Sequence, residues 1–498
     1  MALIPVWIAE IDVLDENNQA KTLYYSDGAY IDDNWNYYEP RMEQPALVQT
    51  SPNDGGTFHI FSEPSVGEIS LINNDGELNF LADYAVDNGN LRLSLIDKDG
   101  MKIPYLTGKI AGKHEDSKNI YLAVRSMSEV LARPHPNKKY LGNNVLPDGV
   151  EGVATDIKGN IKSRVYGSPK NVTPILVNTA RLIYQFSDRN SCVINAVYDK
   201  GSALTPGVRF DFANFSTFQT TTVTAGTFNQ CGGFIKLGAL PSGVVTGDPS
   251  DGTGLAGDVF EQIINELTFT PTITFNTASK AILNSAGKIG ILVTSETSTA
   301  SLLNQIVASI VAAWYFIGDV IYANFVALAT TSVFDLTDAE IIDIERTGTG
   351  LGSNGIPISA VSMQYGKIET VQSQTELAGS LLVSPERISV LANQYRSSFI
   401  FDSAVLSRHP LAESITITSL FCNESDAITA GTRALNLAKN RVDIVKIIAV
   451  VDEIPEIRPF FGFTAYTSDL GYDDGKLLTV SAIEVDAERN MLTIGCFG

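Results

Sequence analysis

The sequence predicts an α+β protein that is predominantly β and has several domains. Short segments of alternating apolar and polar residues occupy both ends of the chain, and turns rich in Asp, Asn and Gly separate them. Between residues 256 and 335 the apolar spacing changes from the period of a strand to that of a helix. The length of 498 residues corresponds to roughly three to four domains of ordinary size.

The composition permits an ordinary buried core, because 44% of the residues are apolar and only 18% are charged. A low charged fraction suits a protein that buries surface against neighbours, although β proteins rich in Thr, Ser and Gly share it. The net charge of −21 disfavours stable binding of nucleic acid, since phosphate contacts need Lys and Arg. The charge is consistent either with simple solubility or with an acidic channel through which DNA slides.

The first predicted domain, residues 1–130, consists of strands. The Gly67–Ile72 strand meets a turn at Asn73–Gly76, and the alternating Asn90–Leu95 strand leads into a hairpin turn at Asp97–Gly100. These paired strands predict an antiparallel sheet.

The second predicted domain, residues 131–255, is β-rich and contains a loop-rich insertion over 206–255. Two proline-containing segments, Arg133–Pro136 and Leu146–Gly149, interrupt long regular elements. We expect the residues from Pro241 to Gly254 to form a loop.

The third predicted domain, residues 256–335, combines helices with a hairpin. We expect Asp258 to cap a helix, with Glu261 completing a capping box. A second helix is predicted over Thr299–Ala312, followed by a hairpin over Trp314–Tyr322. The apolar face of the first helix comprises Val259, Ile263 and Leu267.

The fourth predicted domain, residues 336–498, is β-rich with one helix. The helix begins near Ser425 or Asp426, and the long apolar strand Val442–Val451 follows it. Turns at Asp473–Gly475 and 486–490 are expected to precede the last two strands. The remaining assignments are a turn or short helix at Asp338–Ile341, a strand at Ile358–Tyr365 and a buried helix stripe of Ala430, Ala434, Leu437 and Ala438.

The search for catalytic, metal-binding and cofactor-binding residues yields none, so no enzymatic activity is predicted. No nucleophile elbow, phosphate-binding glycine loop or zinc-protease motif is present. His114, Glu115 and Asp116 do not predict a single catalytic site, because adjacent strand residues point to opposite faces. We expect these three residues at a solvated hairpin tip. The other histidines are His59 and the expected loop residues His135 and His409.

The four cysteines are far apart in sequence and form no C-x-x-C pair. They are Cys192, Cys231, Cys422 and Cys496. Reduced buried thiols are the expectation, as in proteins of a reducing compartment. The alternative is that all four converge in space on an iron–sulfur cluster.

Neither a secretion signal nor a membrane span is expected. The first ten residues lack a positive segment and a long apolar segment. The uncharged stretch Ser301–Gly318 is better explained by a core helix followed by a strand. No stable membrane insertion is therefore predicted.

Three consecutive segments carry a family resemblance. Asp156–Gly167 reads DIKGNIKSRVYG, Asn178–Gln185 reads NTARLIYQ, and Val197–Gly201 reads VYDKG. Their order, together with the stretch from Pro136 to Gly152, resembles the tail hub (baseplate hub) proteins of long-tailed bacteriophages of the siphovirus type. The resemblance covers most of the chain and is weakest at 206–255 and 336–370.

The resemblance implies β-barrel-like hub domains with an α+β portion between them. It also implies a virion structural protein at the tail tip, assembled in the host bacterial cytoplasm as a trimeric ring through which DNA passes. The implied partners are identical copies, the distal tail protein, the tail tube or tape measure protein, and the central fibre or receptor-binding proteins. No cofactor is implied. The alternative function is a β-rich tail-associated enzyme or a carbohydrate-binding fibre component.

Overall fold

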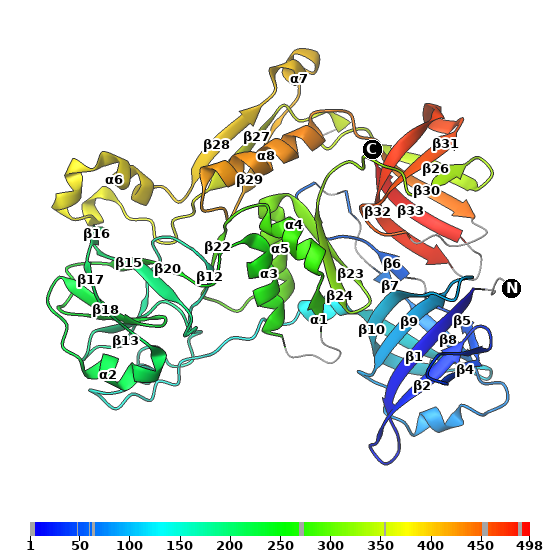
Figure 1. Cartoon of the computed structure of the whole chain (residues 1–498), viewed down its shortest axis with the longest axis horizontal. Coiled ribbons are helices and arrows are strands. Elements are labelled where there is room, and N and C mark those ends of the chain that lie inside the picture. The colour runs from blue at the N-terminus through cyan, green and yellow to red at the C-terminus, as the bar shows by residue number, and fades with distance from the viewer. Residues whose placement is uncertain are drawn as a thin grey trace.

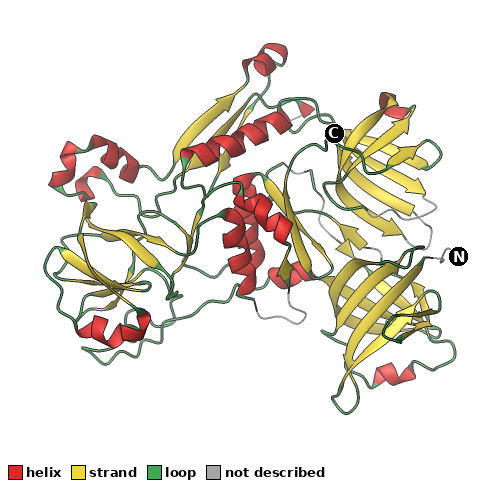
Figure 2. Ribbon diagram, viewed as in Figure 1, coloured by secondary structure: helices red, strands yellow, loops and turns green. Residues whose placement is uncertain are grey.

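The computed structural model confirms a predominantly β α+β protein, with 42% of the chain in strands and 19% in helices. It describes residues 5–46, 48–58, 60–61, 65–267, 273–352, 355–450, 457–486 and 491–498. Two sheets lie at one end of the molecule, helices and a hairpin form the middle, and a smaller β-rich part lies at the other end (Figure 1, Figure 2).

The N-terminal sheet contains nine strands among the described residues. Its pairs are antiparallel except for a parallel contact between two short strands near one edge. The predicted hairpin turn at Asp97–Gly100 is confirmed, since the Asp97 carboxylate accepts hydrogen bonds from the backbone nitrogens of Asp99 and Met101. In spatial order the strands are β3 (Tyr30–Ile31), β4 (Tyr37–Pro40), β2 (Ala20–Ser26), β1 (Val6–Leu14), β9 (Asn90–Ile96), β10 (Lys102–Glu115), β11 (Asn119–Ser126), β8 (Glu68–Ile72) and β5 (Met42–Gln44).

One face of this sheet carries a ladder of ion pairs. The Arg92 guanidinium donates to both carboxylate oxygens of Asp12, at 2.8 and 2.9 Å, and to Glu10 at 2.9 Å. Burial raises the pKa of Asp12, but hydrogen bonds from Arg92, Asn90 and Thr22 outweigh this effect and lower the pKa to about 2. The charged form of Asp12 therefore stabilises the folded sheet.

Acid is expected to weaken this sheet through Asp12. Because the folded pKa lies below its usual value of 3.8, the stabilisation is present above that pH and is lost as the pH falls toward 2. Urea unfolding of wild type and Asp12→Asn between pH 5 and 2.5 would measure the effect, with a smaller loss of stability expected for the variant. Equal losses in the two proteins would contradict this prediction. Asp99→Asn, in the exposed turn, is the control.

The C-terminal sheet contains eight strands in the described part of the chain. A strand from the N-terminal region, β6 (Val48–Thr50), pairs with its longest strand, and β7 (Ser65–Val66) pairs with β6. The other strands, in spatial order, are β25 (Asp335–Thr337), β31 (Gly462–Thr467), β32 (Tyr472–Asp486), β33 (Met491–Phe497), β30 (Ile444–Val450) and β26 (Ile341–Gly348).

The predicted turn at Asp473–Gly475 is wrong, because these residues lie inside β32. The register between β31 and β32 shifts between Ala465 and Thr467, beside this segment. Gly475 has a φ of 85°, which lets the strand deform without ending. The predicted turn at 486–490 falls on 487–490, outside the described residues, although β32 and β33 pair as antiparallel strands on either side of it. Asp338–Glu340 forms a turn, as one of the two expected alternatives.

The two sheets share one hydrophobic core, although they come from opposite ends of the chain. Trp7, Leu93 and Leu122 of the first sheet belong to the same buried cluster as Phe463 and Ile494 of the second. Figure 1 shows the sheets side by side, with β6 and β7 next to both. The N-terminal and C-terminal regions are therefore packed as one unit.

The middle of the molecule holds α3 (Ala256–Asn265), α4 (Thr277–Asn284), α5 (Thr299–Ile310) and the hairpin of β23 (Ala312–Ile317) and β24 (Val320–Phe325). The hairpin is confirmed, with Ile317 paired to Val320 across the two-residue turn. The capping prediction for Asp258 is wrong, because α3 starts at Ala256 and Asp258 lies in its first turn. There it accepts a hydrogen bond from Thr253, and the Thr253 hydroxyl itself accepts from the Leu255 nitrogen.

A second helical layer lies beside this centre. Helix α8 (Glu424–Ala438) covers a sheet with the order β28 (Arg396–Phe401), β27 (Ala360–Tyr365) and β29 (Ser414–Thr418). The predicted stripe is confirmed, because Ala430, Ala434, Leu437 and Ala438 are all buried. Helices α5 and α8 belong to one core cluster, with α1 (Met127–Leu131) at its margin. Helix α7 (Ser403–Arg408) follows β28, and β21 (Thr274–Phe275) pairs with β24.

The remaining β-rich part surrounds two small cores. The loop predicted at Pro241–Gly254 is partly wrong, because Val245–Ser250 forms a strand that pairs with β15 (Val193–Asp199). This long-range pairing overrides the local loop signal of Gly247 and Pro249. The strands are β12 (Arg164–Gly167), β22 (Gly290–Val293), β13 (Ile175–Asn178), β14 (Ile183–Gln185), β19 (Phe234–Leu237), β18 (Thr227–Cys231), β17 (Thr205–Phe210), β15 (Val193–Asp199), β16 (Ser202–Ala203) and β20 (Val245–Ser250). The helices are α2 (Phe215–Thr220) and α6 (Pro385–Ala392), with 3-10 turns at Asn79–Ala82, Phe212–Asn214, Gln374–Glu376, Gly379–Val383 and Asp469–Gly471.

The division at 130, 255 and 335 stays a prediction. The core clusters group residues across these boundaries: strands from 335–348 and 444–497 share a core with the N-terminal sheet, while α8 and β27 share one with α3 and α5. Residues in and before α6 contact the second part, where a Cβ atom built on Gly201 would meet Leu377, Leu381 and Leu391.

Candidate functional site

The segments that carry the family resemblance form a loop and short strands of the small β-rich part. The backbone nitrogen of Tyr140 bonds to the Asn160 carbonyl, and the Gly159 nitrogen bonds to the Tyr140 carbonyl. The Tyr140 hydroxyl donates to Gln185 at 2.7 Å, which connects the loop to the NTARLIYQ segment. The conspicuous sequence pattern is therefore a packing unit.

Gly167 ends this pattern at a point of close backbone contact. Its φ is 64°, and a Cβ atom there would lie 2.0 Å from the Ile289 carbonyl oxygen. Its nitrogen and carbonyl both bond to the backbone of Asp251. Only glycine fits this position without displacing the chain.

A cluster of charged groups lies beside this strand and is centred on Glu266, at the end of α3. Its carboxylate receives Arg164, Arg189 at 2.7 Å and the Tyr166 hydroxyl at 2.9 Å. His135 lies at 3.1 Å from the same carboxylate. The two arginines also pair with separate aspartates, Arg164 with Asp188 at 2.6 Å and Arg189 with Asp251 at 2.7 Å.

The Glu266 cluster has the chemistry of a structural contact between two parts of the chain. Burial raises the pKa of Glu266, but His135, Arg164 and Arg189 outweigh it and leave the pKa below its usual value. A carboxylate that accepts from two guanidinium groups and a phenol has little capacity left for a substrate. The open pocket of about 550 Å³ beside it is lined by charges of both signs, among them Lys138 and Asp188. The cluster therefore ties the small β-rich part to the central helices.

The structure corrects the environment of His135. We expected a loop histidine; it does lie in a loop, but it is only 3% exposed. Its ring nitrogens contact the hydroxyls of Thr299 at 2.9 Å and Tyr166 at 2.8 Å. The sequence around His135 contains no signal that its ring is buried, because the residues that bond to the ring are 31 and 164 positions away.

The other histidines lie elsewhere. His114 ends a strand at the predicted hairpin tip, where its ring stacks on Tyr121, with ring centroids 4.7 Å apart. His409 follows α7 at the surface, and His59 is outside the described residues. In the described part of the chain, no group of three or more His, Cys, Asp or Glu residues is placed to hold a metal ion.

The four cysteines do not converge, so the iron–sulfur alternative is wrong. All four are free, and Cys192, Cys231 and Cys496 lie in three different core clusters. Burial raises the pKa of Cys192 to about 12 and that of Cys231 to about 11. Burial also raises the pKa of Cys422 and Cys496.

These thiols are expected to resist alkylation in the folded protein. The thiolate is the reactive form, and a raised pKa keeps it scarce at pH 8. Iodoacetamide followed by intact mass measurement should give almost no adducts on native protein and four after denaturation. Rapid modification of Cys192, Cys231 and Cys496 in the native protein would contradict their buried positions.

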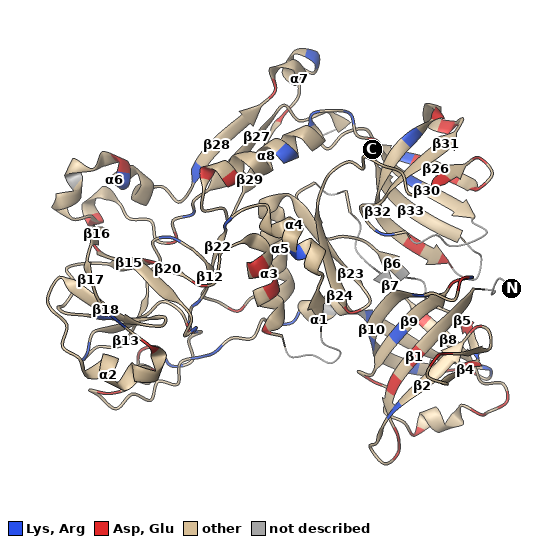
Figure 3. Ribbon diagram, viewed as in Figure 1, with Lys and Arg blue, Asp and Glu red and all other residues tan. Residues whose placement is uncertain are grey.

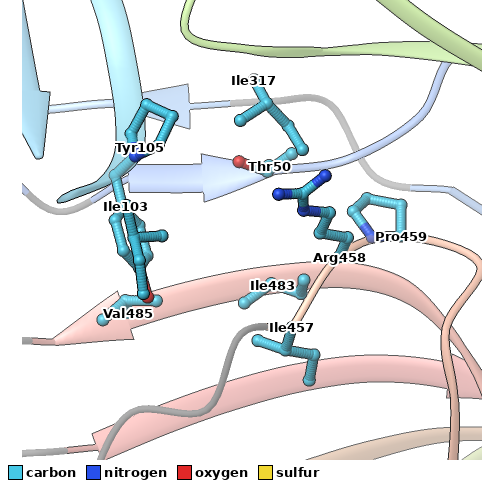
Figure 4. A pocket seen from close by; sticks show the side chains of 10 residues that line it. Thr50, Ile103, Tyr105, Ile317, Ile457, Arg458, Pro459, Ile483 and Val485 are labelled. Carbon is cyan, nitrogen blue, oxygen red and sulfur yellow. The ribbon is translucent and has the colours of Figure 1, made fainter. Parts of the chain in front are cut away.

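Among the described residues, a small cavity of about 40 Å³ lies at the junction between the two large sheets. Figure 4 shows Ile103 and Tyr105 of β10 facing Ile483 and Val485 of β32, with Thr50 of β6 above them. This volume suits one or a few water molecules and no larger ligand. The junction is thus a packed contact between sheets.

Open sheet edges are the structural feature most suited to binding another protein. In the described chain, β26 pairs on one side only, with β30, and Ile342 on it is 60% exposed. The strand β28 likewise has one neighbour, β27. An unpaired edge offers backbone donors and acceptors to a further strand.

Acidic and basic residues are interspersed along the ribbon in Figure 3.

No helix of the described residues is both long and apolar enough to cross a membrane. The stretch Ser301–Gly318 forms most of α5 and then β23, as expected for a core helix followed by a strand.

No family model matches the chain, and no curated protein matches it. It is similar to the solved structure of a tail protein from Neisseria meningitidis MC58, at 8% identity and a TM-score of 0.43, over 99% of this chain and 96% of that chain. It is also similar to a 43 kDa tail protein of prophage MuSo2 from Shewanella oneidensis, at 9% identity and a TM-score of 0.39, over 98% and 95% of the two chains. A third is prophage tail protein gp18 from Listeria monocytogenes EGD-e, at 5% identity and a TM-score of 0.41, over 99% and 94%.

Proposed function

We propose that this chain is a structural subunit of a phage tail tip, a baseplate hub that forms a trimeric ring. The observation that carries the proposal is the pair of β sheets from opposite ends of the chain, which share one core and end in open edge strands such as β26. The order of segments in the sequence, which resembles tail hub proteins, supports the same role.

A closed ring accounts for these edges. An exposed edge strand invites uncontrolled association unless it is covered, and cyclic assembly covers it with an identical copy. The low charged fraction, 18%, is consistent with a subunit that buries much of its surface against others. In this proposal the ring joins the tail tube or distal tail ring to the central fibre or receptor-binding proteins of a siphovirus-type tail.

We further propose that DNA passes through the ring without stable binding. The net charge of −21 supports this, since a negatively charged surface repels the phosphate backbone. The tape measure protein is a proposed partner, as an alternative to the tail tube. In this proposal the subunit assembles in the host cytoplasm and ends in the virion.

We propose no catalytic activity for the chain. The half-buried carboxylate of Glu266 is occupied by Arg164, Arg189 and Tyr166, which supports a structural role. Hydrolysis of cell-wall material by the purified chain would contradict this and favour the alternative of a tail-associated enzyme.

Mass photometry of the purified chain, alone and with the neighbouring tail proteins, tests the ring. The expected result is a species of three times 53.7 kDa, formed alone or on addition of the neighbours. A chain that remains monomeric in both conditions and never associates with tail tube or tip proteins would contradict the proposal.

A further inference from the structure

The three-stranded sheet of β28, β27 and β29 has one covered and one open face. Helix α8 lies along the covered face, as Figure 1 shows. A Cβ atom built on Gly431 of α8 would lie 2.6 Å from Met363 and 2.7 Å from Ile400. Because side chains alternate along a strand, Phe399 and Phe401 point to the opposite face.

The open face consists of apolar residues and uncharged polar residues. Strand register places Ser362 between Phe399 and Thr416. Phe399 is 63% and Phe401 65% exposed, and their rings stack with centroids 6.0 Å apart. The nine residues that share this face are Ala360, Ser362, Gln364, Ser397, Phe399, Phe401, Ser414, Thr416 and Thr418.

A groove of about 520 Å³ continues from this face along α5. Thr418 belongs to both surfaces, and the groove is otherwise lined largely by small and uncharged residues such as Ser301, Gln305 and Ala308. Among the described residues that line it, the charged one is Lys367, which is paired with Glu369 at 2.8 Å. The face and the groove therefore form one uncharged surface on a strongly acidic protein.

We infer that this surface docks a second copy of the same chain. The inference rests on the proposed ring and names one contact within it. Two copies that each carry a charge of −21 repel one another, and a surface without charged residues keeps that repulsion low where they touch. A basic partner would be attracted to acidic regions instead, and exposed aromatic pairs are typical of the centres of protein interfaces.

The first test replaces both phenylalanines by serine and measures self-association by analytical ultracentrifugation. The double variant Phe399→Ser/Phe401→Ser should weaken association roughly 100-fold or more, which is the effect expected from the loss of two interface aromatics. Its thermal midpoint should match wild type, because both side chains are mostly exposed. Leu240→Ser is the matched control, since Leu240 is 81% exposed in another part of the molecule and should leave association unchanged.

A photocrosslinking amino acid at position 399 provides the second test. Irradiation of the assembled protein should yield a product of two copies of this chain, and the same group at position 240 should not. Crosslinks from 399 only to a different tail protein, or unchanged association of the serine variant, would overturn the inference while leaving the ring intact. A wild-type chain that stays monomeric alone and with its neighbours would overturn the inference and the proposed function together.

Discussion

Replacing Glu266 by glutamine is expected to lower the free energy of unfolding by about 3 kcal/mol. The substitution removes the charge that Arg164 and Arg189 share, and it places an amide donor where both guanidinium groups donate. These arginines are only 11% and 19% exposed, so water replaces the lost partner poorly. Thermal or urea unfolding, followed by fluorescence, measures the effect.

Glu261→Gln is the matched control on the same helix. Glu261 pairs with Lys280 at 2.7 Å, but its side chain is 34% exposed. An exposed pair of this kind contributes roughly 0.5 kcal/mol or less. Equal effects of the two substitutions would show that the Glu266 cluster does not hold the small β-rich part to the central helices.

Gly167→Ala is expected to destabilise the protein by more than about 3 kcal/mol and to reduce soluble yield. The added methyl group would meet the Ile289 carbonyl oxygen at 2.0 Å, and the residue would keep a positive φ of 64°. Relief would require separating β12 from β22, which pair at this point. Circular dichroism during thermal unfolding checks the prediction.

Gly159→Ala separates backbone strain from the steric clash. Gly159 also has a positive φ, 83°, but no atom lies within 4 Å of a built Cβ. Its replacement should therefore cost only the strain of the left-handed conformation, about 1 kcal/mol. A Gly159 variant as unstable as the Gly167 variant would mean that the close contact with Ile289 is not the cause.

Local sequence signals predicted much of the secondary structure. The Gly318–Asp319 dipeptide between apolar runs indicated the hairpin, and the spacing of Ala430 and Ala434 indicated the buried side of α8. These predictions succeed because turn chemistry and helical period act within a few residues. The predicted Asp473–Gly475 turn was wrong because a glycine can also accommodate an irregularity within a strand.

Long-range contacts were beyond the reach of these signals. Ser51 donates to the Ser481 carbonyl across 430 residues, and Glu266 meets Arg164 across 102. No period or turn in the sequence reports such a contact. The one available signal for the Glu266 cluster was Arg164 itself. It is a cation within the last five residues of the DIKGNIKSRVYG segment, and the other four are uncharged.

The proposed role at the tail tip requires that identical copies assemble into a closed annulus. Electron microscopy of the purified assembly, with class averages viewed along the symmetry axis, tests it directly. The expected image is a three-fold ring with a central opening. Averages that show only a compact particle without an opening, at any concentration and with the tail neighbours present, would contradict it.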